Sequence, residues 1–137
     1  MRILGLDYGD SRIGVAISDP LGLTAQSLGL IAEKNFDRQV EKVLEYCIET
    51  KAEKIVLGMP KNMNGTIGER GEKTKVFAEA LKEKIDIPII FWDERLTTRA
   101  AHQTLAESKV SGKKRKGILD KIAAVFILQG YLDSQKI

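Results

Sequence analysis

The sequence contains one cysteine and one histidine, too few side chains for an ordinary zinc site. Cys47 has no second cysteine with which to form an internal disulfide, which is typical of a cytoplasmic protein. There is no run of about 18 apolar residues, so we expect no membrane-spanning helix. The opening residues, MRILGLDYGD, lack a small-residue cleavage site and predict a first strand, not a signal peptide.

Two common nucleotide-binding patterns are also missing: a Walker lysine motif and G-x-G-x-x-G. What the chain has is an ordinary globular composition, with 43% hydrophobic and 30% charged residues. Its 137 residues are enough to bury a core and predict a single domain over 1–137. The net charge of +3 is modest and indicates little by itself, but the basic residues are unevenly placed.

Hydrophobic periodicity predicts the element order βββαβαβαα. Residues 2–8 and 13–19 are β-prone runs joined by a short turn, which indicates a hairpin, and 24–32 predicts a third strand. The other expected elements are a helix over 36–48, a strand over 54–60, a helix around 76–81, a strand over 87–94, a helix from 97 or 98 to about 108, a loop over 109–117 and a helix over 118–134. Short connections favour antiparallel strands, and the later βαβ units require parallel ones. The mixed sheet is typical of the ribonuclease-H-like fold, although other α/β folds share this order.

Acidic residues stand at three positions that matter for chemistry. Asp7 ends the first strand, and Asp93 and Glu94 end the last one. Asp120 lies one turn into the final helix, on a face that it shares with two small alanines. A carboxylate packed against a sheet is costly unless a cation neutralises it, so these positions need a partner.

Carboxylates that converge on one point bind Mg²⁺ or Mn²⁺ through oxygen ligands, an arrangement that nucleases use on phosphodiesters. The three acidic positions therefore predict a site for Mg²⁺ or Mn²⁺. The alternative is structural: an acid at a strand end can cap a turn, and Asp120 can favour the helix dipole. We favour the metal site because all three positions fit one topology.

Basic and amide side chains gather in three connections. The turn GDSRIG and the loop MPKNMNGTIGERG each admit a phosphate-binding interpretation, and KVSGKKRKG carries five basic residues and no acid. A plain Asn-Gly turn and a solvated run of charge are the alternatives. The candidate nucleic-acid contacts are Arg12, Lys61, Asn62, Arg70, Lys113, Lys114, Arg115 and Lys116.

Four segments together resemble the YqgF family, the Holliday-junction-resolvase-like nucleases of pre-16S ribosomal RNA. They are MRILGLDYGDSRIGVAISD, VLGMPKNMNGTIGERG, FWDERLTT and DKIAAVFILQGYLDS, and the likeness runs through the whole chain in order. The resemblance implies a ribonuclease-H-like fold with sheet order 3-2-1-4-5, a cytoplasmic location and a role in maturing the 5′ end of 16S ribosomal RNA. Action on branched DNA, as a Holliday-junction resolvase, is the alternative substrate that it implies.

The family's acids fall on Asp7, Asp93, Glu94 and Asp120. The fourth strand ends in GMPKN with no acid, where related resolvases would place one. Because strands one and five are two strands apart, about 9.5 Å, we expect the longer Glu94 to be the metal ligand with Asp7 and Asp120. Arg95 is then expected to pair with Asp93 or to contact a phosphate.

Two further functions are compatible with these motifs. The missing acid on the fourth strand favours a non-catalytic RNA-binding factor for ribosome assembly, built on a nuclease scaffold. The segment DYGDSRIG is similar to the first phosphate loop of actin-like ATPases, but those enzymes need two domains around the nucleotide.

Overall fold

A computed structural model describes residues 2–62, 64–94 and 112–135 of the chain. The elements in these ranges are β1 (Ile3–Tyr8), β2 (Arg12–Ser18), β3 (Ala25–Ala32), α1 (Phe36–Thr50), β4 (Lys54–Met59), α2 (Glu69–Lys82), β5 (Ile89–Asp93) and α4 (Gly112–Ser134). The helix expected near 97–108 and residue Arg95 lie outside the described residues. Of the helices described, none has the length and apolar content that a membrane crossing requires.

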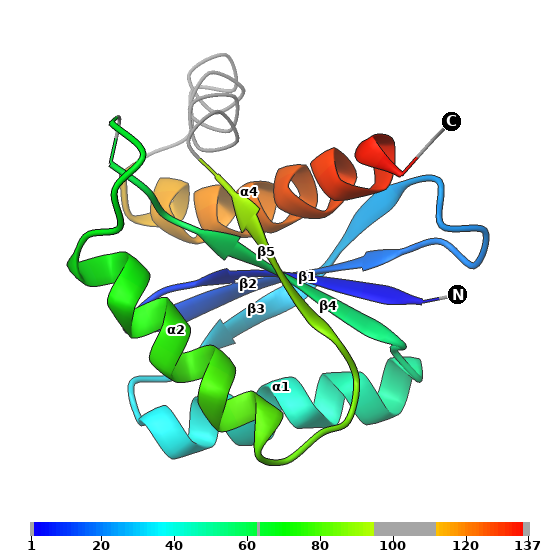
Figure 1. Cartoon of the computed structure of the whole chain (residues 1–137), viewed down its shortest axis with the longest axis horizontal. Helices are drawn as coiled ribbons and strands as arrows, with labels where there is room; N and C mark the ends of the chain where they lie inside the picture. The colour runs from blue at the N-terminus through cyan, green and yellow to red at the C-terminus, as the bar shows by residue number, and fades with distance from the viewer. Residues whose placement is uncertain (1, 63, 95–111, 136–137) are drawn as a thin grey trace.

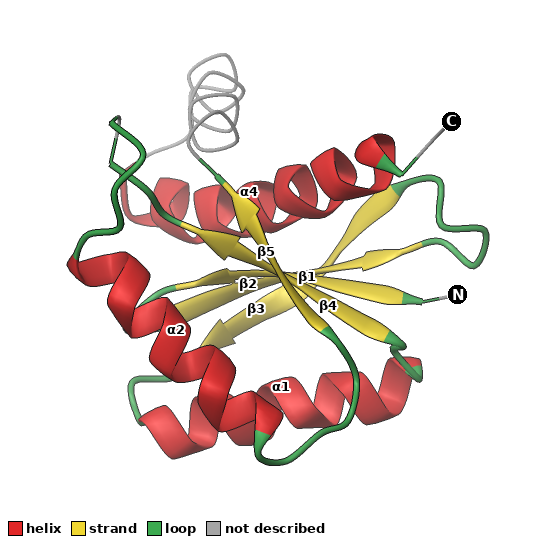
Figure 2. Ribbon diagram, in the orientation of Figure 1, coloured by secondary structure: helices red, strands yellow, loops and turns green. Residues whose placement is uncertain are grey.

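The strands form one sheet in the order β3-β2-β1-β4-β5 (Figure 2). β1, β2 and β3 are antiparallel neighbours, whereas β4 runs parallel to β1 and β5 runs parallel to β4. Tight turns connect the first three strands and helices connect the later ones, which is why the two halves pair differently. The predicted mixed sheet and its 3-2-1-4-5 order are confirmed.

Helices cover both faces of the sheet: α4 lies on one face, and α1 and α2 lie on the other (Figure 1). The α1 and α2 side has a core that includes Val43, Cys47 and Phe77. A second core on the α4 side includes Ala124, Ile127 and Leu128. Cys47 is buried, as its place on the apolar stripe of α1 predicts.

Glycines let α4 approach the sheet closely. A Cβ on Gly5 of β1 would lie 2.6 Å from the Leu128 Cβ, and one on Gly14 of β2 would clash with the main-chain carbonyl of Asp120. A side chain at either position would therefore push α4 outward. The part of α4 around Asp120 is thus held close to the carboxyl-terminal end of β1, where Asp7 pairs with Gly14.

The loop predicted over 109–117 is wrong from residue 112 onward, because α4 begins at Gly112. Lys113, Lys114, Arg115 and Lys116 thus lie in the first turns of a helix. Lysine and arginine are good helix formers, so the basic run can continue the helix toward its amino end. Positive charge opposes the dipole at a helix amino terminus, but this effect is too small to prevent the helix here.

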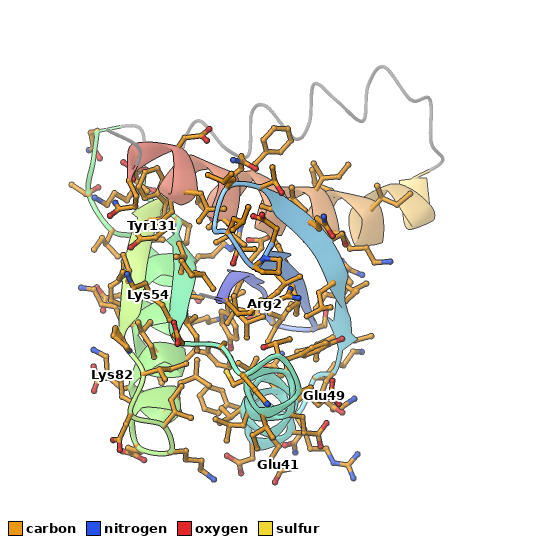
Figure 3. All side chains as sticks on the ribbon, turned by 90° about the vertical axis from the view of Figure 1, so that its right-hand side faces the viewer. Arg2, Glu41, Glu49, Lys54, Lys82 and Tyr131 are labelled. Atoms are coloured by element: carbon orange, nitrogen blue, oxygen red, sulfur yellow. The ribbon has the colours of Figure 1, made fainter. Side chains whose placement is uncertain are left out.

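The carboxyl-terminal part of α4 is fixed by polar and aromatic contacts at the opposite end of the sheet. Lys54 and Tyr131, both labelled in Figure 3, meet where the Lys54 Nζ donates to the Tyr131 hydroxyl at 2.9 Å. The Trp92 ring of β5 packs edge-on against Tyr131, with ring centroids 6.1 Å apart. These contacts hold α4 across β4 and β5.

Candidate active site

Asp7 lies between two glycines. It pairs directly with Gly14 of β2, and the parallel register of β1 and β4, continued by one residue, places Gly58 on its other side. Both glycines belong to the face of the sheet that α4 covers. Asp7 therefore has space on both sides, and residues from other elements fill it.

Asp120 of α4 lies over Gly14. Its main chain sits where a Gly14 side chain would be, so this part of α4 lies directly beside Asp7. Because α4 begins at Gly112, Asp120 lies about two turns into the helix and not one turn, as the sequence predicted. The Arg12 Nε donates to the Asp120 Oδ2 at 2.9 Å. Arg12 is the first residue of β2, so this ion pair joins the hairpin to α4.

The Glu94 side chain reaches Asp7 across Gly58, from the β5 side of the sheet. Its N–H donates to the Met59 carbonyl at 3.3 Å, which extends the pairing of β5 with β4 by one residue. The Glu94 side chain then folds back over β4, where its carboxylate occupies the space that a Cβ on Gly58 would need. Glu94 is only 6% exposed. The place that a side chain on β4 would fill is thus occupied by an acid from β5.

These acids line one open cavity of about 360 Å³. Its walls come from the end of β1, the β1–β2 turn, the start of β2, the start of α2, the residue after β5 and the part of α4 around Asp120. The lining residues are Asp7, Gly9, Asp10, Ser11, Arg12, Arg70, Glu94, Leu119, Asp120 and Ala123. The cavity therefore combines carboxylates with two arginines.

Burial raises the pKa of Asp7 well above its ordinary value, and the charges of Glu94 and Asp120 raise it further. Burial also raises the pKa of Glu94, and the negative charge of Asp93 adds to this effect. Arg70 acts against both shifts and lowers the two pKa values. These carboxylates are costly to ionise together, and a further cation in the cavity would relieve that cost.

The carboxylates suit a divalent cation by their chemistry, because Mg²⁺ prefers hard oxygen ligands. Among the described residues, no three His, Cys, Asp or Glu side chains form a group that could hold a metal ion by themselves. A set of three is not required for Mg²⁺, which proteins commonly bind through one or two carboxylates together with water and substrate phosphates. The residues thus fit a cation that shares its coordination sphere with a ligand.

The structure separates the remaining predicted residues into two groups. Arg12 and Arg70 line the cavity with Asp7, Glu94 and Asp120, whereas Asp93, Lys61 and Asn62 are absent from its lining. Asn62 instead shapes its own loop, where its N–H donates to the Thr66 carbonyl at 2.8 Å. The side chains of residues 113–116, like Arg95, lie outside what the structure describes.

Sequence reasoning missed the role of Gly58. Its sequence signal was available, because a glycine stands next to Asp7 once the parallel register of β1 and β4 is assumed. Asp10 and Ser11 of the hairpin turn also line the cavity. A Cβ on Gly9 would lie 2.7 Å from the Arg12 carbonyl, so this turn is too tight for a larger residue at that position.

The family described as "RuvX: Holliday junction resolvase" matches residues 1–134 of this chain. A protein of Clostridium tetani named "Putative pre-16S rRNA nuclease" is 56% identical over 134 residues, which cover 98% of this chain and 97% of that protein. A protein of Clostridium novyi with the same name is 54% identical, over 98% of this chain and 99% of its own. The chain belongs to the RuvX/YqgF family. The resemblance carried by the four sequence motifs is confirmed.

Solved structures support the fold assignment of this RuvX family member. Thermus thermophilus RuvC in complex with a Holliday junction substrate aligns with a TM-score of 0.62 at 15% identity, covering 98% of this chain and 96% of its own. The fowlpox virus resolvase, also in complex with Holliday junction DNA, aligns at 0.59 with 16% identity and 98% of both chains. At such low identity these likenesses show the fold alone. The ribonuclease-H-like fold is confirmed.

Proposed function

We propose that this chain is a metal-dependent endonuclease that hydrolyses phosphodiester bonds in precursor 16S ribosomal RNA in the cytoplasm. The RNA substrate follows the name of its relatives in the RuvX/YqgF family. The observation that carries the proposal is that Asp7, Glu94 and Asp120, from three distant parts of the chain, line one open cavity with two arginines.

Asp7 and Glu94 are the residues that would hold the cation, together with Asp120. When bound, Mg²⁺ or Mn²⁺ supplies a Lewis acid that polarises a phosphate and lowers the pKa of a coordinated water. Asp7 is fixed by the β1–β2 ladder and Glu94 by its N–H bond to β4, so both carboxylates are presented by rigid elements. A site built on strands in this way is positioned more precisely than one built on loops.

Arg12 and Arg70 supply positive charge beside the acids. A guanidinium offers several N–H donors in a planar fork that matches a phosphate, so both residues can bind and orient the substrate backbone. Arg70 also lowers the pKa of Asp7 and Glu94, which partly offsets the effect of burial on both carboxylates. The first turns of α4, which contain the basic residues 113–116, lie at the same end of the molecule as these acids (Figure 1).

The test is cleavage of precursor 16S ribosomal RNA by the purified protein, with Mg²⁺, with Mn²⁺ and with neither. Asp7→Asn and Glu94→Gln should each abolish metal-dependent cleavage, because each removes a carboxylate charge from the cavity. Asp86→Asn is the matched control, since Asp86 is exposed in the α2–β5 connection and outside the cavity lining. Full cleavage by Asp7→Asn would remove Asp7 from the mechanism.

A four-way DNA junction serves as the competing substrate in the same experiment. The family description and the junction complexes of the structural neighbours favour including it. Junction cleavage without RNA cleavage would make the protein a Holliday-junction resolvase. Salt-sensitive RNA binding with no cleavage under any divalent ion would identify a non-catalytic assembly factor.

A further inference from the structure

The ion pair between Arg12 and Asp120 lies in the wall of the cavity. The Arg12 Nε and the Asp120 Oδ2 are 2.9 Å apart, and the two side chains are 32% and 25% exposed. The distance is that of a charge-assisted hydrogen bond, and partial burial makes such a pair stronger than one in full solvent. Part of the negative charge of the cavity is thus already neutralised by the chain itself.

The same carboxylate oxygen cannot serve Arg12 and a cation equally well. A divalent ion that uses Asp120 competes with the guanidinium for an oxygen lone pair and is repelled by its charge. Arg12 therefore opposes ion binding at Asp120 as long as the pair is intact.

Arg12 has a second possible partner in the same cavity. It begins β2 directly after the turn residues Asp10 and Ser11, which line the cavity with it. A guanidinium released from Asp120 stays within this wall, where an entering phosphate would be its natural partner. The exchange leaves no charge unpaired: Asp120 gains the cation while Arg12 gains the phosphate.

We propose that Arg12 is a positioning residue that holds Asp120 in the free protein and passes to the substrate phosphate when a divalent cation takes Asp120. This inference rests on the proposed nuclease function. Arg12 thereby couples cation binding to substrate binding, because each ligand frees the group that the other requires. A cation alone binds weakly, and a cation with substrate binds well.

The test begins with calorimetric titration of Mn²⁺ into the RNA-free protein. Arg12→Gln should bind Mn²⁺ about tenfold more tightly than the parent, because the competing charge-assisted bond is gone. Arg12→Lys, which keeps the charge but loses the planar fork, should fall between the two. Arg38→Gln is the matched control: the Arg38 side chain is 70% exposed and pairs with Glu33 outside the cavity, so Mn²⁺ binding should not change.

The second measurement is steady-state cleavage of the precursor RNA at saturating Mn²⁺. Arg12→Gln should raise KM about tenfold, because the phosphate loses its guanidinium partner. The signature is therefore tighter ion binding together with weaker substrate binding. If Arg12 had a purely structural role, Arg12→Gln would weaken both Mn²⁺ binding and RNA binding. If Arg12→Gln does not fold, as shown by the loss of its thermal transition, the same two measurements are made on Arg12→Lys.

Two outcomes overturn the coupling and are distinguishable. If parent and Arg12→Gln bind Mn²⁺ equally tightly while cleavage requires the metal, the coupling is wrong and the nuclease function stands. If neither protein binds Mn²⁺ and neither cleaves RNA with it, the coupling and the metal-dependent mechanism fail together.

Discussion

The carboxylate of Glu94 lies in the space above Gly58, so that the acid directly after β5 takes the place of a side chain on β4. The contact also involves α4, because a Cβ on Gly58 would lie 2.5 Å from the Ile127 Cδ1. Glu94 can therefore take this position only because residue 58 has no side chain. The acid reaches the cavity because the intervening strand has no side chain there.

Gly58→Ala should therefore impair both stability and cleavage. The added methyl displaces Glu94 or Ile127, and overpacking of this kind costs about 1–3 kcal/mol of the free energy of unfolding. The RNA cleavage rate should fall with it, by about tenfold or more, because a misplaced ligand group weakens catalysis strongly. Chemical denaturation and a cleavage assay at saturating Mg²⁺ measure the two effects.

Gly117→Ala is the matched control for this substitution. Gly117 lies in α4, and the one neighbour of its added Cβ within the described part of the chain would be the Leu30 Cδ2, at 3.5 Å, an ordinary contact. Replacing a helical glycine by alanine should stabilise the protein by roughly 0.5–1 kcal/mol. Equal effects of the two substitutions would show that Gly58 has no special relation to Glu94.

Asp7 should make the metal-free protein less stable as pH rises. Its pKa is about 3.9 in an unfolded chain, and burial raises it well above this value in the native state. Between the two values the native state binds more protons than the unfolded state, so the free energy of unfolding falls with increasing pH until the native pKa is passed. Asp7→Asn should remove this fall and raise Tm at pH 7–8 by a few degrees.

Thermal melts in EDTA from pH 4 to pH 8 measure this difference. Parent and Asp7→Asn should melt at nearly the same temperature near pH 4, where the native carboxyl is protonated and the unfolded one is still about half protonated, so little of the difference has developed. Asp86→Asn, at an exposed position, should keep the pH dependence of the parent. A Tm difference that is constant with pH would mean that ionisation of Asp7 is not its cause.

The sequence predicted the fold well because its signals were local. Short turns, strand lengths and the apolar stripe of α1 each depend on neighbouring residues, and they led to the element order and the mixed sheet. The strand order 3-2-1-4-5 came from the family resemblance. The start of α4 was misjudged because Lys113–Lys116 carry two opposed signals. Their side chains favour a helix, while their charge opposes its dipole, and the helix propensity prevails.

The candidate site was only partly predictable. Asp7, Glu94 and Asp120 could be selected because acids at strand ends and on an inner helix face stand out in a sequence. The Arg12–Asp120 pair joins residues 108 positions apart, and the space above Gly58 depends on three elements packing together. Such relationships exist only in the assembled structure.

Cys47 should be unreactive in the native protein. It is buried in the core on the α1 and α2 side of the sheet, and burial raises the pKa of its thiol to about 11. The reactive thiolate is therefore scarce at pH 8, and reagent has little access. Iodoacetamide followed by mass spectrometry should modify Cys47 only after denaturant is added, and rapid modification of the folded protein would contradict its assignment as a core residue.

Arg70 should set the lower pH limit of the proposed nuclease. Its positive charge lowers the pKa of Asp7 and Glu94, so its removal makes both carboxylates harder to ionise. In Arg70→Gln the acidic limb of the pH–rate profile should therefore move to higher pH. Arg70→Lys should restore much of the original profile because it keeps the charge. Lys75→Gln, which alters an exposed ion pair with Glu72 on the same helix, should leave the limb in place. A lower rate in Arg70→Gln with an unmoved limb would assign Arg70 to phosphate binding alone.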